Sequence, residues 1–227
     1  MATTSTPRGP AGLGTRDRLL AAATAEFASR GFDGAKVDRI ATRARVNKAM
    51  LYYHFHSKTA LYQTILLDQF GRVASAVAAV PEKGGAPEAQ LHAFIQAVAE
   101  EVLRRPLFPP LWLREVADGG RHLSPAIVGE LRRIVETLAI ILERGRATGV
   151  FRAVNPFVTQ IGIVAPLLVF AAAGPIRERF RKIIPTEVAG AGLQLILGHV
   201  LTATLAAVVL PPDQIPVAGP SPRRQHS

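Results

Sequence analysis

The sequence predicts an all-α protein with a small N-terminal helical unit followed by a larger helical domain. Three observations lead to this prediction. Ala- and Leu-rich runs recur at the spacing of amphipathic helices, alternating strand-like patterns are scarce, and Gly and Pro residues separate the runs. Of the 227 residues, 48% are hydrophobic, which is enough for a sizeable core.

The N-terminal unit is expected to contain a helix, a turn and a second helix at close spacing. A first helix should end at Gly31, because glycine readily adopts the conformation that closes a helix. Ser57 is expected to cap the N-terminus of a long helix that begins near Lys58. The expected helices are 15–30, 36–43, 47–54 and one from about 58, with a turn at 44–46.

The rest of the chain is punctuated by loops between helical segments. Loops or breaks are expected at 81–87, 106–110 and 119–120, a helix from Pro125 to about Arg146, and two very apolar segments at 156–173 and 188–210. Both ends are rich in proline and small polar residues and are expected to be disordered. The predicted organisation is a flexible basic arm (1–14), a small helical unit (15–62), a large helical domain (63–210) and a tail (211–227).

The segment 47–54 has an unusual outer face for a short helix. At about 100° per residue, Leu51 and Phe55 fall on one side, while Ala49 and Tyr53 point the opposite way. Met50 and Tyr52 flank the latter pair. A solvated face poorly explains two tyrosines and a methionine, whereas contact with a partner explains them well.

Positive charge is concentrated in the same region. The chain has a formal net charge of +10. Residues 1–60 contain ten Lys and Arg against four Asp and Glu, and 10 − 4 = +6. A little over a quarter of the chain therefore has more than half of the net charge, which is typical of binding to a phosphate backbone.

The run GFDGAKVDRIATRARVNKAMLYYHFHSKTALY resembles the N-terminal domain of TetR-family transcriptional regulators. The similarity covers about fifty residues with unbroken spacing. The matching features are Gly31-Phe32, the segment 37–41, Val46-Asn47-Lys48, the segment 51–55, and Ser57-Lys58. The resemblance implies a three-helix helix-turn-helix domain that binds a palindromic double-stranded DNA operator as a homodimer, most often as a repressor.

The resemblance also implies roles for particular residues. Base edges in the major groove would be contacted by Lys48, Ala49, Met50 and Tyr53. The phosphate backbone would be held by Lys36, Tyr52, His54 and Lys58, with Asn47 at the start of the reading helix.

Three positions depart from the family pattern. Lys36 stands where a Ser or Thr usually caps the second helix, so a side-chain cap is lost. Arg45 replaces a turn glycine and is expected to require a strained or altered turn. Met50 replaces a small hydroxyl residue, which should change the preferred base.

The large domain is expected to bind a small apolar or amphipathic effector. Its pocket would be drawn from apolar residues of the helical body, with Arg121 and His122 as polar groups. The candidate lining residues are Phe94, Phe108, Trp112, Arg121, His122 and Phe170, together with Leu111, Leu138, Ile141 and Val164. In the family the last two long helices form the dimer interface, which would explain why the segments 156–173 and 188–210 are apolar on all sides.

Other classes of function are less well supported by the sequence. There is no cysteine, and no metalloprotease, nucleophile-elbow or P-loop motif, so we expect a non-enzyme without metal or cofactor in the cytoplasm. The 188–210 segment has no charged residue and could span a bilayer, but Gln194 and His199 would be costly in lipid. A membrane-associated protein with a DNA-binding head, and a helical protein that sequesters a ligand without binding an operator, remain as alternatives.

Overall fold

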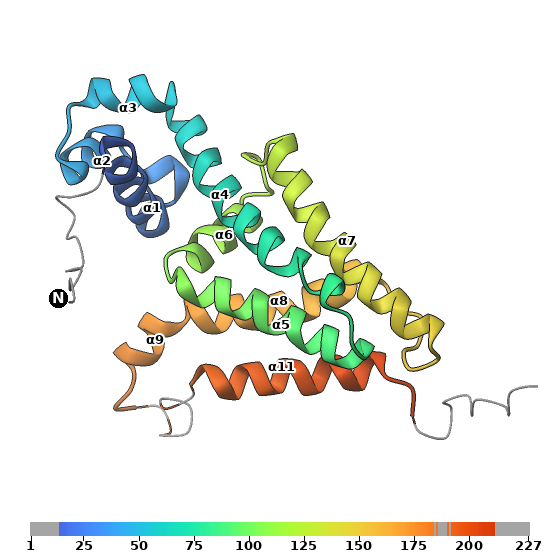
Figure 1. The fold of residues 1–227 in the computed structure, drawn as a ribbon. Helices are drawn as coiled ribbons and strands as arrows, with labels where there is room; N and C mark the ends of the chain where they lie inside the picture. The colour runs from blue at the N-terminus through green and yellow to red at the C-terminus, as the bar shows by residue number, and fades with distance from the viewer. Residues whose placement is uncertain (1–13, 184, 186–189, 191, 212–227) are drawn as a thin grey trace, which may run out of the picture.

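The computed structural model describes residues 14–183, 185, 190 and 192–211, and these residues form an all-α fold (Figure 1). The helices are α1 (Thr15–Gly34), α2 (Val37–Ala44), α3 (Lys48–Phe55), α4 (Lys58–Ala78), the short 3₁₀ turn η2 (Pro81–Lys83), α5 (Pro87–Arg104), α6 (Phe108–Ala117), α7 (Pro125–Ala147), α8 (Pro156–Ala172), α9 (Gly174–Arg179) and α11 (Leu193–Val208).

Side-chain caps fix the start of four of these helices. The side chain of Asn47 accepts a hydrogen bond from the backbone N–H of Ala49 at 2.9 Å, and that of Ser57 accepts from Ala60 at 3.0 Å. Ser124 and Asn155 cap α7 and α8 in the same way. Each cap satisfies a backbone donor that has no partner within its helix, which explains why these boundaries can be recognised in the sequence.

Helices α1, α2 and α3 form a compact head at one end of the molecule (Figure 1). Their inner faces meet around Leu19, Phe27, Ile40 and Leu51, none of which is exposed. The ring of Phe27 lies 4.8 Å from that of Tyr62 on α4, centroid to centroid, in an edge-to-face contact. The head therefore shares its core with the start of α4, the helix that joins it to the body.

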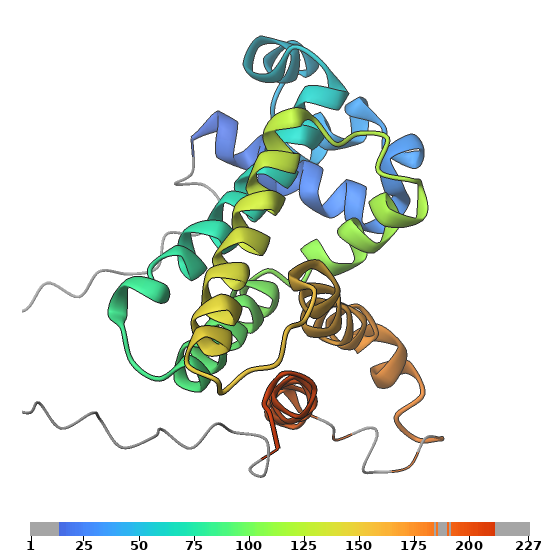
Figure 2. The same ribbon diagram turned by 90° about the vertical axis from the view of Figure 1, so that its right-hand side faces the viewer.

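The body is built on α4, α5 and α7, with α8 and α11 lying together across its base (Figures 1 and 2). Figure 2 looks almost along the axis of α11. The connection from α7 to α8 pairs with the end of α11, since the N–H of Arg152 donates to the Val208 carbonyl and that of Leu210 to the Val150 carbonyl. These bonds fix the C-terminal part of α11 against the body.

Most of the expected boundaries agree with the structure, with two differences. Gly31 does interrupt the first helix, with φ of 70° and ψ of 178°, but one more helical turn follows it and α1 ends at Gly34. The expected break at 106–110 is shorter, because α6 begins at Phe108 and includes Pro109 and Pro110 in its first turn. Within the expected apolar segment 188–210, α11 begins at Leu193. The expectations for residues 1–13, 188, 189, 191 and 212–227 fall outside the described residues.

The longest apolar helices are shorter than a membrane span. Helix α8 has 17 residues and α11 has 16. A transmembrane helix needs about 20 apolar residues. No helix among the described residues is long and apolar enough to cross a membrane.

Gly145 on α7 allows a close contact that no larger residue would permit. A Cβ atom added there would lie 2.0 Å from Cδ2 of Phe151, a fully buried ring. We predict that Gly145→Ala lowers the free energy of unfolding by about 3 kcal/mol or more. The added methyl group would overlap the Phe151 ring, which is buried and has no free space to move into. Urea denaturation of the purified protein measures the change.

Gly129 on the same helix is the matched control. No atom lies within 4 Å of a Cβ added at Gly129. Gly129→Ala should therefore stabilise the protein by about 0.5–1 kcal/mol, through the helix preference of alanine. Equal effects of the two substitutions would contradict the role assigned to Gly145.

Candidate DNA-binding site

Helices α2 and α3 are joined by a tight turn centred on Arg45. This residue has φ of 55° and ψ of 48°, which is the left-handed conformation. Its N–H donates to the Thr42 carbonyl at 3.1 Å, and the N–H of Val46 donates to the Ala41 carbonyl at 3.1 Å. The turn thus closes α2 in the usual way for a helix-turn-helix unit, with an arginine in a conformation that favours glycine.

The strain at Arg45 can be tested by substitution. We predict that Arg45→Gly raises the free energy of unfolding by about 1 kcal/mol, because glycine adopts the left-handed conformation without steric cost. Thermal or urea denaturation gives the measurement. Arg43→Gly, which places glycine within α2, should instead destabilise by about 1 kcal/mol. Destabilisation by both substitutions would mean that the turn carries no strain.

The outer face of α3 is exposed, and its inner face is anchored in the head. Leu51 and Phe55 are buried, as the helical periodicity predicts. Tyr53 is 75% exposed and Tyr52 44% exposed, and Ala49 is also exposed. Met50 is half-buried. Helix α3 lies at the outer edge of the head in Figure 1, and the exposure of Tyr52 and Tyr53 puts both side chains at the protein surface.

Exposed cations surround this face. Lys36, Arg43 and Arg45 are exposed, and none of them forms an ion pair with a described residue. Lys48 differs, because its Nζ atom lies 2.8 Å from Oδ1 of Asp38. The hydrogen bond to Asp38 raises the pKa of Lys48. A Lys48 side chain that contacted a base would have to leave Asp38 first.

The remaining predicted contact residues are partly engaged within the protein. Asn47 uses its side-chain oxygen to cap α3. His54 is half-buried and its Nε2 atom is buried without a hydrogen-bond partner, so a contact with DNA would have to use Nδ1. The Nζ atom of Lys58 lies 4.5 Å from the centroid of the Phe32 ring, a cation–π contact that holds this cation beside the head.

A buried carboxylate that the sequence reasoning missed holds α2 in place. Oε1 of Glu26 on α1 accepts from Nε of Arg39 at 2.5 Å and from the backbone N–H of Lys36 at 3.4 Å. Lys36 provides no side-chain cap. Glu26 therefore supplies, from another helix, the bond to the N-cap backbone N–H that a glutamate within the helix supplies in a capping box.

The charge on Glu26 is stabilised in the folded protein. Burial alone would raise the pKa of Glu26, but the hydrogen bonds from Arg39 and Lys36 and the charges of Arg39 and Arg30 together lower it below its ordinary value. Glu26 is only 5% exposed. In the sequence, Arg43 and Glu26 stand out only as contributions to the net charge of residues 1–60. That net charge does not show that Arg43 is exposed beside α3 or that Glu26 is buried.

The helical body contains an apolar cavity of about 430 Å³ between α4, α5, α6, α7 and α8. Of the predicted pocket residues, Phe108, Trp112 and Val164 line it. Gln160 on α8 also lines it, and its Oε1 atom is buried without a hydrogen-bond partner. This main cavity is thus apolar with one polar group, which is typical of a small-molecule site.

Seven of the predicted pocket residues lie elsewhere. Phe94 is part of the closed core and has no exposed surface. Phe170 lies toward the end of α8, where the guanidinium of Arg177 stacks 3.9 Å from the centroid of its ring. Arg121 forms an ion pair with Asp33 at 2.6 Å, and His122 is buried against the head. Leu111, Leu138 and Ile141 are buried core residues outside the cavity lining.

His122 belongs to a cluster that joins the body to the head. Its backbone N–H and Nδ1 both contact the buried carboxylate of Glu115, at 2.8 Å and 2.9 Å. Its ring lies 3.9 Å from that of Phe32 on α1, centroid to centroid. Burial and the neighbouring Glu115 raise the pKa of Tyr62, so its hydroxyl stays protonated and donates to Glu115. Tyr62 on α4 and His122 thus both contact the carboxylate of Glu115 on α6, and their rings pack on Phe32 of α1.

Two segments of the chain match models of known protein families. Residues 19–65 match the model described as bacterial regulatory proteins of the tetR family. Residues 87–182 match the model described as the C-terminal domain of tetracyclin-repressor-like proteins. The first match covers the head and the start of α4, and the second covers the helical body from α5 to just beyond α9.

Curated relatives are regulators of the same type. The transcriptional repressor NicS of Pseudomonas putida is 31% identical over 147 residues, which cover 61% of this chain and 66% of NicS. The transcriptional activator FasR of Mycolicibacterium smegmatis is 44% identical over 62 residues, 27% of this chain and 28% of FasR. The chain thus spans just under two thirds of NicS and a much smaller share of FasR.

Solved structures share the fold along most of their length. A regulatory protein of the tetR family from Rhodococcus RHA1 has a TM-score of 0.71 at 19% identity, covering 87% of this chain and 98% of that one. The ketosteroid transcriptional regulator KstR2 of Mycobacterium tuberculosis has a TM-score of 0.66, also at 19% identity, covering 87% and 96%. With a tyrosine-bearing α3 after a tight turn, and with family models matched in this order over head and body, the chain belongs to the TetR family of bacterial regulatory proteins.

Proposed function

We propose that this chain is a ligand-responsive transcriptional regulator that binds a palindromic operator as a homodimer and is released by a small apolar or amphipathic effector. The main supporting observation is the outer face of α3, where Tyr53 is 75% exposed, together with the nearby Arg43 and Arg45, which are exposed and form no ion pair with a described residue. Repression is the favoured mode, since NicS is named a repressor, although FasR is named an activator.

Base edges and phosphates would be contacted by different residues of the head. Ala49, Met50 and Tyr53 offer apolar and hydroxyl contacts to the major groove, and Lys48 joins them once it leaves Asp38. Lys36, Tyr52, His54 and Lys58 are assigned to the phosphate backbone, and we add Arg43 and Arg45 because both are exposed beside α3.

The apolar outer surface of α8 and α11 supports a homodimer. Val158 and Val169 on α8 are 65% and 56% exposed, and Leu195 on α11 is 66% exposed. Exposed apolar residues that gather on two adjacent helices are characteristic of an interface. A two-fold dimer through these helices would present two copies of α3 to a site with matching symmetry.

The main cavity is the proposed effector site. Its walls come from α6 and α8 as well as from α4, the helix that continues into the head. The buried Oε1 atom of Gln160 favours a ligand that carries one hydrogen-bond donor on an apolar body. Such a ligand would release the operator by favouring a position of α4 in which the two heads no longer match the half-sites.

Binding to DNA from upstream of its own gene tests the proposal. We expect the logarithm of the affinity to fall linearly with the logarithm of the salt concentration, by about 0.9 for each phosphate contacted. Static light scattering should give a dimer, and Val158→Asp, which puts a charge on the exposed face of α8, should give a monomer. If no salt-sensitive binding appears while the protein still binds small apolar molecules, the chain is a ligand-sequestering protein instead.

A further inference from the structure

A second cavity lies between the head and the body, apart from the proposed effector site. Its volume is about 370 Å³. The walls come from α1, from α4 and from the 105–108 connection between α5 and α6. We call it the junction cavity. Leu20, Ile65, Leu107 and Phe108 give it an apolar surface.

One buried polar side chain on its wall has no partner. Gln69 on α4 is 2% exposed, and its Nε2 atom is buried without a hydrogen-bond partner among the described residues. A buried donor without a partner is costly, and such groups are rare in folded proteins. Rotation of the terminal amide would turn this N–H toward an acceptor held in the cavity.

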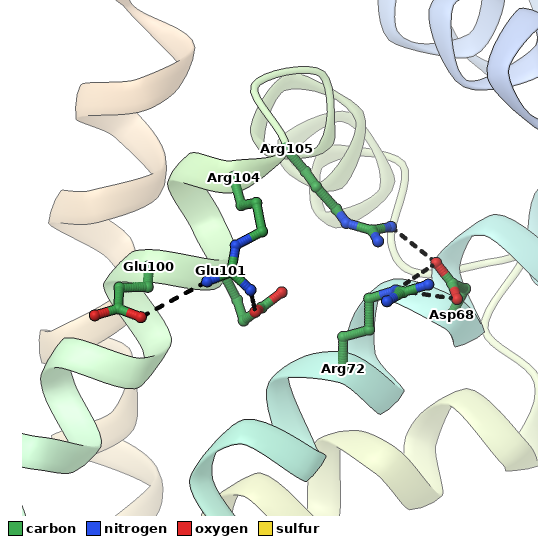
Figure 3. A network of polar contacts seen from close by, with 6 residues as sticks. All are labelled: Asp68, Arg72, Glu100, Glu101, Arg104 and Arg105. Atoms are coloured by element: carbon green, nitrogen blue, oxygen red, sulfur yellow. Dashed lines mark hydrogen bonds and ion pairs between the residues drawn. The ribbon is translucent and has the colours of Figure 1, made fainter. Parts of the chain in front are cut away.

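The charged residues at the cavity also offer donors rather than acceptors. Figure 3 shows the carboxylate of Asp68 between two guanidinium groups, one from Arg72 on the same helix and one from Arg105 across the gap. Nε of Arg72 lies 3.1 Å from Oδ2 of Asp68, and Nη1 of Arg105 lies 2.8 Å from the same oxygen. Asp68 and Arg105 line the cavity and their charges cancel, while Arg72, which does not line it, gives the Asp68 carboxylate a second partner. The other nitrogens of Arg105 make no hydrogen bond within the described residues.

The acidic residues that approach from α5 add no negative charge to the wall of the cavity. Glu101 is paired with Arg104, which also lies 3.7 Å from Glu100 (Figure 3). Neither glutamate lines the junction cavity. The two guanidinium groups hold the pKa of Asp68 below its ordinary value against the effect of burial, so its carboxylate is ionised and occupied at neutral pH.

We propose that the junction cavity is a second ligand site, which takes a compact amphipathic monocarboxylate. The apolar part of the ligand lies against Leu20, Ile65 and Phe108. The carboxylate accepts hydrogen bonds from the amide of Gln69 and from the free N–H groups of Arg105. Because the ligand contacts α1 and the body at once, it fixes the angle of the head. Phe108 lines both cavities, so occupancy of one alters a wall of the other.

Calorimetric titration of the full-length protein tests the site, with cyclohexanecarboxylate as the probe. Cyclohexylmethylamine has a similar size and the opposite charge. We expect the carboxylate to bind with one site per chain, and the amine to bind at least about tenfold more weakly, since it offers donors to a site that already has donors. No heat with millimolar carboxylate, or equal binding of both probes, overturns the proposal.

Three variants, each compared with the wild-type chain, show which of the two cavities binds the probe. Gln69→Leu removes the amide, and Ala21→Leu fills the exposed edge of the junction cavity from α1. Each should weaken carboxylate binding at least about tenfold. Ala165→Leu changes the wall of the main cavity and should leave binding within about twofold of the wild-type chain. If Ala165→Leu abolishes binding and Ala21→Leu does not, the probe occupies the main cavity and the proposal fails.

The melting temperature of Gln69→Leu shows whether a loss of binding comes from a loss of folding or from a lost contact with the ligand. Leucine has no buried polar group to leave unpartnered, so the melting temperature of the ligand-free variant should equal or exceed that of the wild-type chain. Loss of binding in a variant of undiminished stability supports a direct contact with the ligand, whereas wild-type affinity in Gln69→Leu overturns it. No DNA is present in these titrations, so failure here leaves the proposed operator binding untouched.

Discussion

Tyr53→Ala should weaken binding to the upstream DNA by about tenfold to a hundredfold, equivalent to ~1–3 kcal/mol, without changing the melting temperature. Tyr53 is 75% exposed and contributes little to the core, so its removal costs the fold almost nothing. Its ring forms only an edge-to-face contact with His54, at 5.1 Å between centroids. A large exposed aromatic on a rigid helix therefore has its main energetic role in the complex. Fluorescence anisotropy with labelled DNA gives the affinity.

The matched control for Tyr53 is an exposed apolar residue far from the head. Ile140 on α7 is 48% exposed, and Ile140→Ala should leave DNA affinity unchanged. Tyr53→Phe separates the ring from the hydroxyl, and retention of affinity would assign the contact to the apolar ring. If Tyr53→Ala and Ile140→Ala both bind like the wild-type chain, α3 is not the reading helix.

The head could be predicted closely from the sequence because its signals are local. Ser57 was expected to cap a helix, and it does so through a bond to Ala60, only three positions away. Asn47 was placed inside the helix 47–54, and the structure has it as the N-cap instead. The burial of Leu51 and Phe55 follows from helical periodicity alone. Arg45 was expected in an altered turn because it stands where glycine is usual, and the structure has it in the left-handed conformation.

The polar groups of the body could not be predicted because their partners are distant in the sequence. Arg121 and His122 were assigned to the effector pocket, but Arg121 pairs with Asp33 and His122 packs on Phe32, both about ninety residues earlier on α1. Only tertiary packing brings them together. Gln69 and Gln160 look like ordinary surface amides in the sequence, and only the fold encloses them without partners.

Glu26 holds α2 against α1 through its bonds to Arg39 and Lys36, and we call this arrangement the Glu26 clamp. Its removal is the second single substitution that we expect to change stability strongly. Glu26→Ala leaves the Arg39 guanidinium and the Lys36 N–H without their shared acceptor, inside the contact that sets α2 against α1. We expect a loss of about 3 kcal/mol in the free energy of unfolding, at the lower end for a broken buried ion pair because Arg39 is partly exposed. DNA affinity should fall as well, since α2 positions the turn that leads to α3.

The pH dependence of stability distinguishes a charged clamp from simple packing. The folded pKa of Glu26 is lowered from its ordinary value of 4.5, so its contribution is present in full above that value. It is lost as the pH falls from about 4.5 through the folded pKa, because the unfolded chain then binds the proton more readily. Glu26→Gln keeps an acceptor but not the charge, and its stability should therefore change less than that of the wild-type chain over this acid range.

Glu143 provides the control for this acid-range measurement. It pairs with Arg146 on the fully exposed surface of α7, and that pairing also lowers the pKa of Glu143. Water screens this pair, so Glu143→Gln should leave the stability–pH curve unaltered within error. If Glu26→Gln also follows the wild-type curve from pH 6 down to about pH 3, the carboxylate charge does not hold the head together. The burial of Glu26 would then reflect its packing alone.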